Sequence, residues 1–185
     1  MTCMRAFAIL FVSGGLAICN ALAASAQEVK IDALHSHASF SVNHVMIQRV
    51  TGTVPIVSGT ITLAPDGVTP LAVTAILDPR RLSTGDPDRD GDLQGDGWFD
   101  TKKFSTWDFK STAVTPGPNG TFGIAGTITI HGVTQPVTLA ATVIARKGYR
   151  AVAHIDRHAF GMKTGRMDSL VGSEVTIDLD ISTAK

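Results

Sequence analysis

Five aspartates and three glycines crowd residues 86–98, DPDRDGDLQGDGW, at a spacing that could bind a cation. Asp86, Asp88 and Asp90, with a glycine next, match the first half of an EF-hand loop, in which alternate oxygens reach one calcium ion. The twelfth position is Gly97, where that loop needs a glutamate to hold the metal with both oxygens. The segment is therefore half of a calcium loop, and its role depends on the elements around it.

A second candidate for metal binding is the string HIDRH near the C-terminus. His154, Asp156 and His158 would share one face of a strand, where side chains two residues apart can converge on a metal. The alternative is that they lie on a solvent-exposed face, where Asp156 pairs with Arg157 or with a neighbouring strand. A metal-dependent site at these three residues is kept as an alternative function, and no metal ligand is assigned.

Motifs that carry catalysis are missing from the sequence. It contains no G-x-S-x-G elbow, no H-E-x-x-H pair and no phosphate-binding glycine loop. The carboxylates fall in loops or at outward strand positions, where solvation is more common than acid and base chemistry. We therefore expect no catalytic residue and no cofactor, and we predict that the protein is not an enzyme.

The first 26 residues have the pattern of a secretory signal peptide. Arg5 precedes an apolar run, and the small residues ASA stand at the cleavage site. Serine, glycine and asparagine interrupt the apolar run, so no stable membrane span is expected. Both cysteines, Cys3 and Cys19, lie within this segment, which leaves the mature chain without a thiol. We expect export to the periplasm of one domain at residues 27–185.

The charge pattern argues against a nucleic-acid partner. The chain carries 16 basic and 16 acidic residues, and no run of lysine or arginine contains interleaved aromatics. We therefore look for a partner among small molecules.

Alternating apolar and polar residues predict an all-β chain. In the last run, Val175, Ile177, Leu179 and Ile181 alternate with polar residues, so one face is apolar. About eight or nine such runs are expected, separated by turns rich in glycine and proline. They include ASFSVN, GTITLA, AVTAIL, WDFKSTAV, FGIAGTITI, VTLAATVIA and YRAVAHIDR. Alternation alone leaves open whether the strands form two stacked sheets or a closed barrel.

Residues 80–103 are too long and too polar for a hairpin turn. Long insertions in small domains are usually functional or disordered, and the nearby aromatics Trp98, Phe99, Phe104 and Trp107 favour order. The aromatic cluster, which Phe109 extends, could be a core patch below the loop or the lining of a ligand pocket.

Four ordered blocks of sequence resemble the YceI-like polyisoprenoid-binding family. The first is DRDGDLQGDGWFDTKKFSTWDFKS, and the others are IDALHSHASFSVNH, GTITIHGVTQPVTL, and IDRHAFGM followed by LVGSEVTIDLD. The residues of the first block that carry the likeness are Arg89, Asp90, Leu93, Trp98, Phe99, Asp100, Phe109 and Ser111. The blocks span nearly all of residues 27–185.

The resemblance implies an extended antiparallel, eight-stranded lipocalin-like barrel, with a long loop or short helix around residues 80–103. An eight-stranded barrel is just wide enough to hold one small ligand. The implied ligand is a polyisoprenoid or isoprenoid quinone in an apolar tunnel, bound without chemical change. The expected tunnel lining is Phe40, Val42, Ile61, Leu63, Val73, Trp98, Phe99, Phe104, Trp107, Phe109, Ile128, Ile130, Leu139, Val143, Phe160, Ile177 and Leu179.

The polar end of the ligand is harder to place. His35, Ser36, Asp90 and Arg157 are the residues that we predict to contact a head group. Another amphiphile, such as a fatty acid or fatty amide, would ask for the same apolar lining and stays an alternative. A homodimer is expected by family analogy alone.

Overall fold

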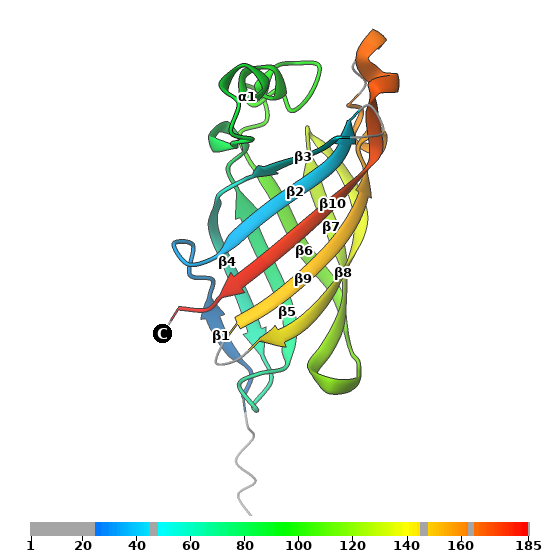
Figure 1. The fold of residues 1–185 in the computed structure, drawn as a ribbon. Coiled ribbons are helices and arrows are strands. Elements are labelled where there is room, and N and C mark those ends of the chain that lie inside the picture. The colour runs from blue at the N-terminus through cyan, green and yellow to red at the C-terminus, as the bar shows by residue number, and fades with distance from the viewer. Residues whose placement is uncertain (1–24, 45–47, 145–147, 163–164, 185) are drawn as a thin grey trace, which may run out of the picture.

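Within the residues that the computed structural model describes, 25–44, 48–144, 148–162 and 165–184, ten antiparallel strands form one curled sheet (Figure 1). The strands are β1 (Gln27–Lys30), β2 (His37–His44), β3 (Gln48–Thr53), β4 (Ile56–Leu63), β5 (Pro70–Leu77), β6 (Trp107–Pro116), β7 (Thr121–Ile130), β8 (Val133–Ile144), β9 (Gly148–Asp156) and β10 (Val171–Ser182). Their order across the sheet is β1-β4-β5-β6-β7-β8-β9-β10-β2-β3. The all-β prediction is confirmed. The predicted signal peptide lies almost entirely outside the described residues.

The strand pattern follows from alternating burial. Along β7, Phe122, Ile124, Ile128 and Ile130 are buried, and the residues between them, except the buried Gly126, are half-buried. Because side chains of a strand point alternately to its two faces, one face of β7 meets the interior. The same pattern in β8 and β9 closes the curled sheet around an apolar interior.

The count of ten strands, against the eight expected, has a local cause. The chain bends between β1 and β2, so that Ile31 donates its N–H to Gly59 of β4 and bridges Thr183 beyond β10. Val54 and Pro55 interrupt the chain between β3 and β4, and proline has no N–H to continue a ladder. Each bend divides one long strand into two, so eight runs of chain still surround the interior.

The segment predicted as a long loop or short helix contains both. A 3₁₀ turn, η1 (Pro79–Arg81), precedes the helix α1 (Pro87–Gln94). The Asp86 side chain accepts hydrogen bonds from the N–H groups of Asp88 and Arg89, and Pro87 occupies the first helical position. This aspartate therefore caps a helix.

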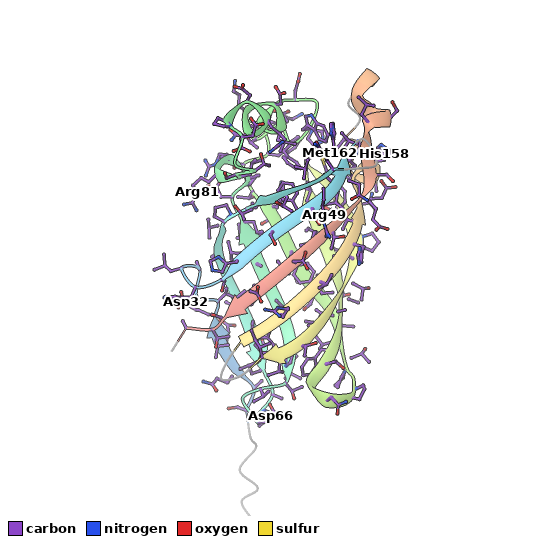
Figure 2. All side chains as sticks on the ribbon, in the orientation of Figure 1. Asp32, Arg49, Asp66, Arg81, His158 and Met162 are labelled. Carbon is purple, nitrogen blue, oxygen red and sulfur yellow. The ribbon has the colours of Figure 1, made fainter. Side chains whose placement is uncertain are left out.

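The two ends of the barrel differ. Figure 1 shows α1 at one end, together with the 3₁₀ segments η3 (Arg157–Phe160) and η4 (Gly165–Leu170). In Figure 2, Met162 and His158 lie at this end, and Asp66 lies at the other end, in the β4–β5 turn. The part of the chain that the structure describes contains no helix of the length and hydropathy needed to cross a membrane.

Candidate functional site

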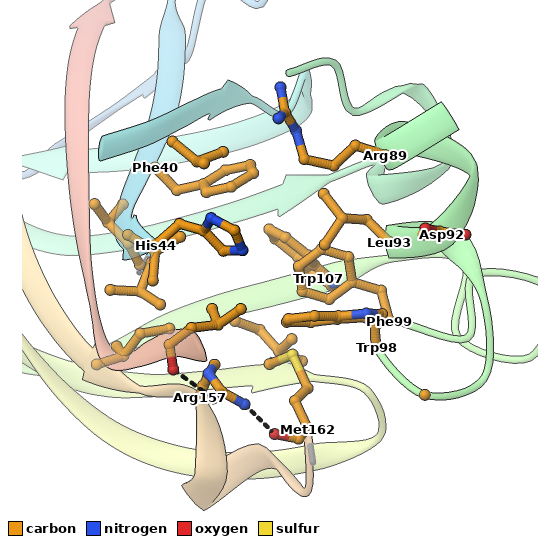
Figure 3. Close-up of a pocket in the computed structure, with 18 residues that line it drawn as sticks. Phe40, His44, Arg89, Asp92, Leu93, Trp98, Phe99, Trp107, Arg157 and Met162 are labelled. Atoms are coloured by element: carbon orange, nitrogen blue, oxygen red, sulfur yellow. Dashed lines mark hydrogen bonds between the residues drawn. The ribbon is translucent and has the colours of Figure 1, made fainter. Parts of the chain in front are cut away.

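A cavity of about 490 Å³, which we call the wide chamber, lies at the α1 end of the barrel (Figure 3). Asp92 and Gly97 line it and are exposed, so its rim reaches the protein surface. The remaining lining residues are Phe40, Val42, His44, Val50, Arg89, Leu93, Trp98, Phe99, Trp107, Ile130, Ile155, Arg157, Met162, Val171, Val175 and Ile177.

A second cavity of about 110 Å³, the narrow chamber, continues along the barrel. Its lining is almost entirely apolar and includes Ile61, Ile128, Leu139, Ala151 and Leu179. Phe40, Trp107 and Ile177 line both cavities. The two chambers therefore meet at these three side chains, which we call the neck.

Inward residues around the neck are less buried than those of the packed core. Val42, Ile177 and Leu179 are half-buried, although strand alternation points them inward. Ala153 on β9, which lines neither chamber, is by contrast only 1% exposed. A side chain that faces the interior and still has exposed surface faces an open space, so β2 and β10 form a wall of the tunnel.

Tyr149 closes the far end of the narrow chamber. It is 7% exposed, lines the chamber and donates its hydroxyl to the Val68 carbonyl at 2.7 Å. Burial raises the pKa of this phenol, and the nearby Asp66 carboxylate adds to the shift. The hydrogen bond ties β9 to the β4–β5 turn across the end of the barrel.

Arg157 supports the wall of the wide chamber. Its guanidinium donates to the carbonyls of Met162, Asp168, Val171 and Gly172 at 2.8–3.0 Å, and to the Asp168 carboxylate at 2.7 Å. These five bonds use all five N–H groups of a guanidinium. Its Cζ atom lies over the ring of Trp98, 5.6 Å from the ring centroid. Figure 3 shows the bond to Met162 at the edge of the chamber.

Thr84 holds the start of α1 against the barrel. The Asp90 carboxylate accepts from the N–H and hydroxyl of Thr84 at 2.7 and 2.6 Å, and these bonds lower the pKa of Asp90. Arg89 donates to the same hydroxyl at 2.8 Å and lies 3.7 Å from Asp86. Arg89 and Asp90 are thus joined through the hydroxyl of Thr84.

The predicted head-group residues lie at different places. His35 and Ser36 line neither chamber: His35 is exposed and bonds Asp32, whose pKa this bond lowers, and buried Ser36 bonds the backbone of Ser182. Asp90 also lies outside the lining. Arg157 lines the wide chamber, with its N–H groups bound within the chain. Contact with a ligand stays a prediction for all four.

Most residues of the predicted tunnel lining do line one of the chambers, and four do not. Leu63 is 5% exposed and packs in a core cluster with Ile31 and Ile61, while Val143 packs beside the core. Phe104 lies against Gly132 and edge-on to His131. Phe160 is 1% exposed in η3. Proximity in sequence grouped Phe104 with Trp98, Phe99 and Trp107, but its side chain lies against the β7–β8 turn.

Several lining residues were missed. Val175, Ile155 and Ile181 follow the same alternation as Ile177 and could have been found from it. Leu93, Met162 and Val171 come from α1 and from the ends of 3₁₀ segments. Their inward direction depends on the contacts of Arg157 and Thr84, which no local pattern encodes.

The alternative metal site does not form a cluster. His154 is exposed on β9 near Glu174, whereas His158 bonds Asp168 and the Asp156 side chain accepts from the His158 N–H. Across the described ranges of the chain, no group of three or more His, Cys, Asp or Glu residues is arranged to hold a metal ion. In the aspartate-rich segment, the Asp86 carboxylate caps α1 and the Asp90 carboxylate anchors Thr84.

One donor at the neck has no partner. The Trp107 side chain is 7% exposed, and its indole N–H finds no acceptor among the described residues. The ring stands edge-on to Phe99, with centroids 4.7 Å apart. A buried donor without an acceptor is uncommon in folded proteins and needs an explanation.

Comparisons with known proteins agree with this architecture. The family model described as "YceI-like domain" matches residues 29–183. A UPF0312 protein of Vibrio cholerae is 28% identical over 167 residues, which cover 84% of this chain and 88% of that protein. Among solved structures, Burkholderia cenocepacia BcnA superposes with a TM-score of 0.75 at 24% identity, covering 84% of this chain and 99% of BcnA.

A second solved structure is a polyisoprenoid binding domain from Saccharophagus degradans implicated in plant cell wall breakdown. It superposes with a TM-score of 0.65 at 17% identity and covers 83% of this chain and 96% of that domain. At these identities both structures show a shared fold.

Proposed function

The chain belongs to the YceI-like family, and from that premise we propose that it binds a long-chain lipid inside its barrel without altering it. The observation that carries the proposal is the pair of chambers, which meet at the neck and run from the surface near α1 to Tyr149. Each methylene moved from water into such a lining contributes about 0.8 kcal/mol, part of which offsets the cost of association.

An isoprenoid tail is the ligand class that we favour. A structural neighbour of this chain is a polyisoprenoid binding domain, and the narrow chamber here is lined mainly by branched and small apolar side chains, which suit a methyl-branched chain. An isoprenoid lipid or quinone is therefore proposed, and a fatty acid or fatty amide is the main competing outcome of the test below.

We propose binding in place of catalysis because the arginines of the wide chamber are engaged within the protein. Arg157 bonds four carbonyls and Asp168, and Arg89 bonds Thr84. Groups held in this way support a wall and are poorly placed to act on a substrate. With export to the periplasm, which we propose from the N-terminal sequence, the protein would carry or store a lipid in an aqueous compartment.

The direct test is native mass spectrometry of the protein purified from a Gram-negative host, followed by organic extraction of the released ligand. A stoichiometric prenyl-tailed molecule supports the proposal. A fatty acid or amide would keep the binding function and change the ligand class, and protein that stays empty when offered either class would contradict the proposal. The same spectrum reports whether the protein is a homodimer.

A charge in the lining should abolish binding. Val42 is half-buried in the wall of the wide chamber between its register partners Val50 and Val175, so a carboxylate there would lose water among apolar side chains. We expect the Val42→Asp variant to retain at most about one tenth of the lipid that the unmodified protein binds. The matched control is Val57→Asp, at a valine that is 39% exposed on β4, and it should keep its lipid. Folding of both variants is checked by circular dichroism, and a folded Val42→Asp protein that retains lipid would reassign the inward face.

A further inference from the structure

We propose that the neck orients the ligand: the tail passes into the narrow chamber, and the polar head stays in the wide chamber beside the indole N–H of Trp107. This inference rests on the proposed function, because it specifies how a lipid lies in the same cavities. It adds a head-group contact at the neck, whereas His35 and Ser36 line neither chamber.

The neck is formed by opposite walls of the barrel. Phe40 and Ile177 are register partners on β2 and β10. Trp107 begins β6, which β7, β8 and β9 separate from β10 in the sheet. Side chains from opposite walls therefore meet here, and they constrict the interior between a cavity of about 490 Å³ and one of about 110 Å³.

Gly52 sets the width of the neck. It is the register partner of Phe40 on β3, and a Cβ atom at this position would lie 2.4 Å from Cζ of the Phe40 ring. Because only glycine leaves this space, the ring can lie against the β3 backbone. A side chain at position 52 would push the ring away from β3 and change the opening between the chambers.

The two chambers suit different ends of an amphiphile. His44, Arg89, Asp92 and Arg157 line the wide chamber, whereas the polar side chains that line the narrow chamber, besides Trp107, are those of Ser39 and Tyr149. The Tyr149 hydroxyl already donates to a carbonyl. A polar head in the narrow chamber would lose its hydrogen bonds with water and gain few in return.

The unpartnered donor indicates where an oxygen of the head would lie. Trp107 lines both chambers, and its buried N–H lacks an acceptor among the residues described. An unsatisfied buried donor is costly, so a ligand that supplies an acceptor recovers that cost. Because the ring lines the wide chamber, we assign a carbonyl or hydroxyl oxygen of a head held there as the acceptor for this N–H.

The orientation can be measured with tryptophan fluorescence, which a benzoquinone quenches on contact. The chain has two tryptophans, so Trp98→Phe leaves Trp107 as the single reporter. The probes are prenyl benzoquinones with short and with long tails, and native mass spectrometry confirms that each is bound. We expect strong quenching of equal extent for both tails. Quenching that weakens as the tail lengthens would overturn the orientation, because the head would then lie away from the neck.

The hydrogen bond is tested with Trp107→Phe, which keeps an aromatic ring and removes the donor. Affinity for a prenyl benzoquinone should fall about five- to tenfold, while affinity for the prenyl hydrocarbon of the same length stays unchanged. An equal loss for both probes would mean that the indole acts only through packing. If neither probe binds the unmodified protein, the proposed function itself fails, which separates the two outcomes.

The width of the neck is tested with Gly52→Ala. We expect long-tailed probes to bind at least about tenfold more weakly, because the displaced Phe40 ring obstructs the path into the narrow chamber. Combining Gly52→Ala with Phe40→Leu should restore binding, since the smaller side chain vacates the clash. Gly91→Ala is the control, at a helical glycine with open space around it. Failure of the double variant to recover, with its fold intact, would contradict the role of this pair.

Discussion

The wide and narrow chambers are built from different kinds of structure. Strand residues supply nearly all of the narrow chamber, and their directions are fixed by the backbone ladders of the sheet. The wide chamber adds residues from α1, from the turn that follows it and from the segment around η3. The apolar tail would thus meet the regular part of the barrel, and the head would meet the irregular part.

The irregular walls depend on a few polar side chains. Arg157 joins Met162, Asp168, Val171 and Gly172, and Thr84 joins Arg89 and Asp90. The walls of the narrow chamber are held by the many backbone hydrogen bonds of the sheet, so they depend less on any one side chain. Loss of one side chain should therefore damage the wide chamber more than the narrow one.

The largest expected effect is that of Arg157→Met. The arginine is 2% exposed, and its loss removes five hydrogen bonds, four to carbonyls and one to the Asp168 carboxylate. Breaking a buried charged network of this kind costs about 3–5 kcal/mol. Urea unfolding, followed by circular dichroism, would measure the loss of unfolding free energy.

Arg150→Met is the matched control for this experiment. Arg150 bonds Asp180 at 2.8 Å on the outer face of the barrel, with 63% of its side chain exposed. Exposed ion pairs contribute within about 1 kcal/mol, so this variant should be nearly as stable as the unmodified protein. Equal losses at the two arginines would refute the idea that Arg157 holds the wide chamber together.

A smaller effect on stability, confined to the narrow chamber, is expected of Ala151→Leu. Ala151 is 5% exposed on β9 and lines this chamber, so a larger side chain would fill the space that we propose the tail occupies. Overpacking costs about 1–3 kcal/mol, which the small cavity partly relieves. Binding of a long-tailed lipid, measured by native mass spectrometry, should fall by at least about tenfold.

The outer face of the neighbouring strand provides the control. Ala140→Leu makes the same change at an exposed position of β8, next to Val152 of β9, and should leave binding unchanged. If Ala151→Leu binds the long-tailed lipid as tightly as Ala140→Leu does, the narrow chamber does not receive the tail.

The same division explains how much the sequence could predict. Alternation identified Ile177 and Leu179 as inward residues, because strand geometry converts a period of two directly into a face. The strand β3 was not expected, since QRVTGT has Val50 as its single apolar side chain and owes its place to pairing with β2.

The wide chamber could be predicted only in part. An aspartate before a proline is a helix start signal, and at Asp86 and Pro87 it was present but was read first as a metal pattern. The positions of Met162 and Val171 follow from hydrogen bonds to Arg157, whose partners are up to 15 residues away in sequence. Aromatic proximity grouped Phe104 with Trp107, although Phe104 packs on the β7–β8 turn. Local sequence contains the period of a strand but not the direction of a loop side chain.

The smallest effect at neutral pH is expected at the closed end of the narrow chamber. Tyr149→Phe removes the hydrogen bond to Val68 and costs about 1 kcal/mol of unfolding free energy. The structural change is confined to one oxygen atom, so the strand-lined walls should keep their lipid. Urea unfolding at neutral pH gives the difference, and a variant that empties the chamber would show that this end is not held by the sheet.

At high pH, the Tyr149→Phe variant is expected to lose less unfolding free energy than the unmodified protein does. Burial raises the pKa of Tyr149 above its ordinary value of 10.0, so the folded protein favours the neutral phenol more than the unfolded chain does. The stability from this difference is complete below pH 10.0 and is lost as the pH rises through the folded-state pKa. The Tyr149→Phe variant lacks this group and should show a flatter decline of unfolding free energy in that range.

Because Tyr149 is the single tyrosine of the chain, ultraviolet absorbance of its phenolate reports the titration directly. Ionisation at the ordinary value would mean that water reaches the phenol and that the narrow chamber is open at both ends.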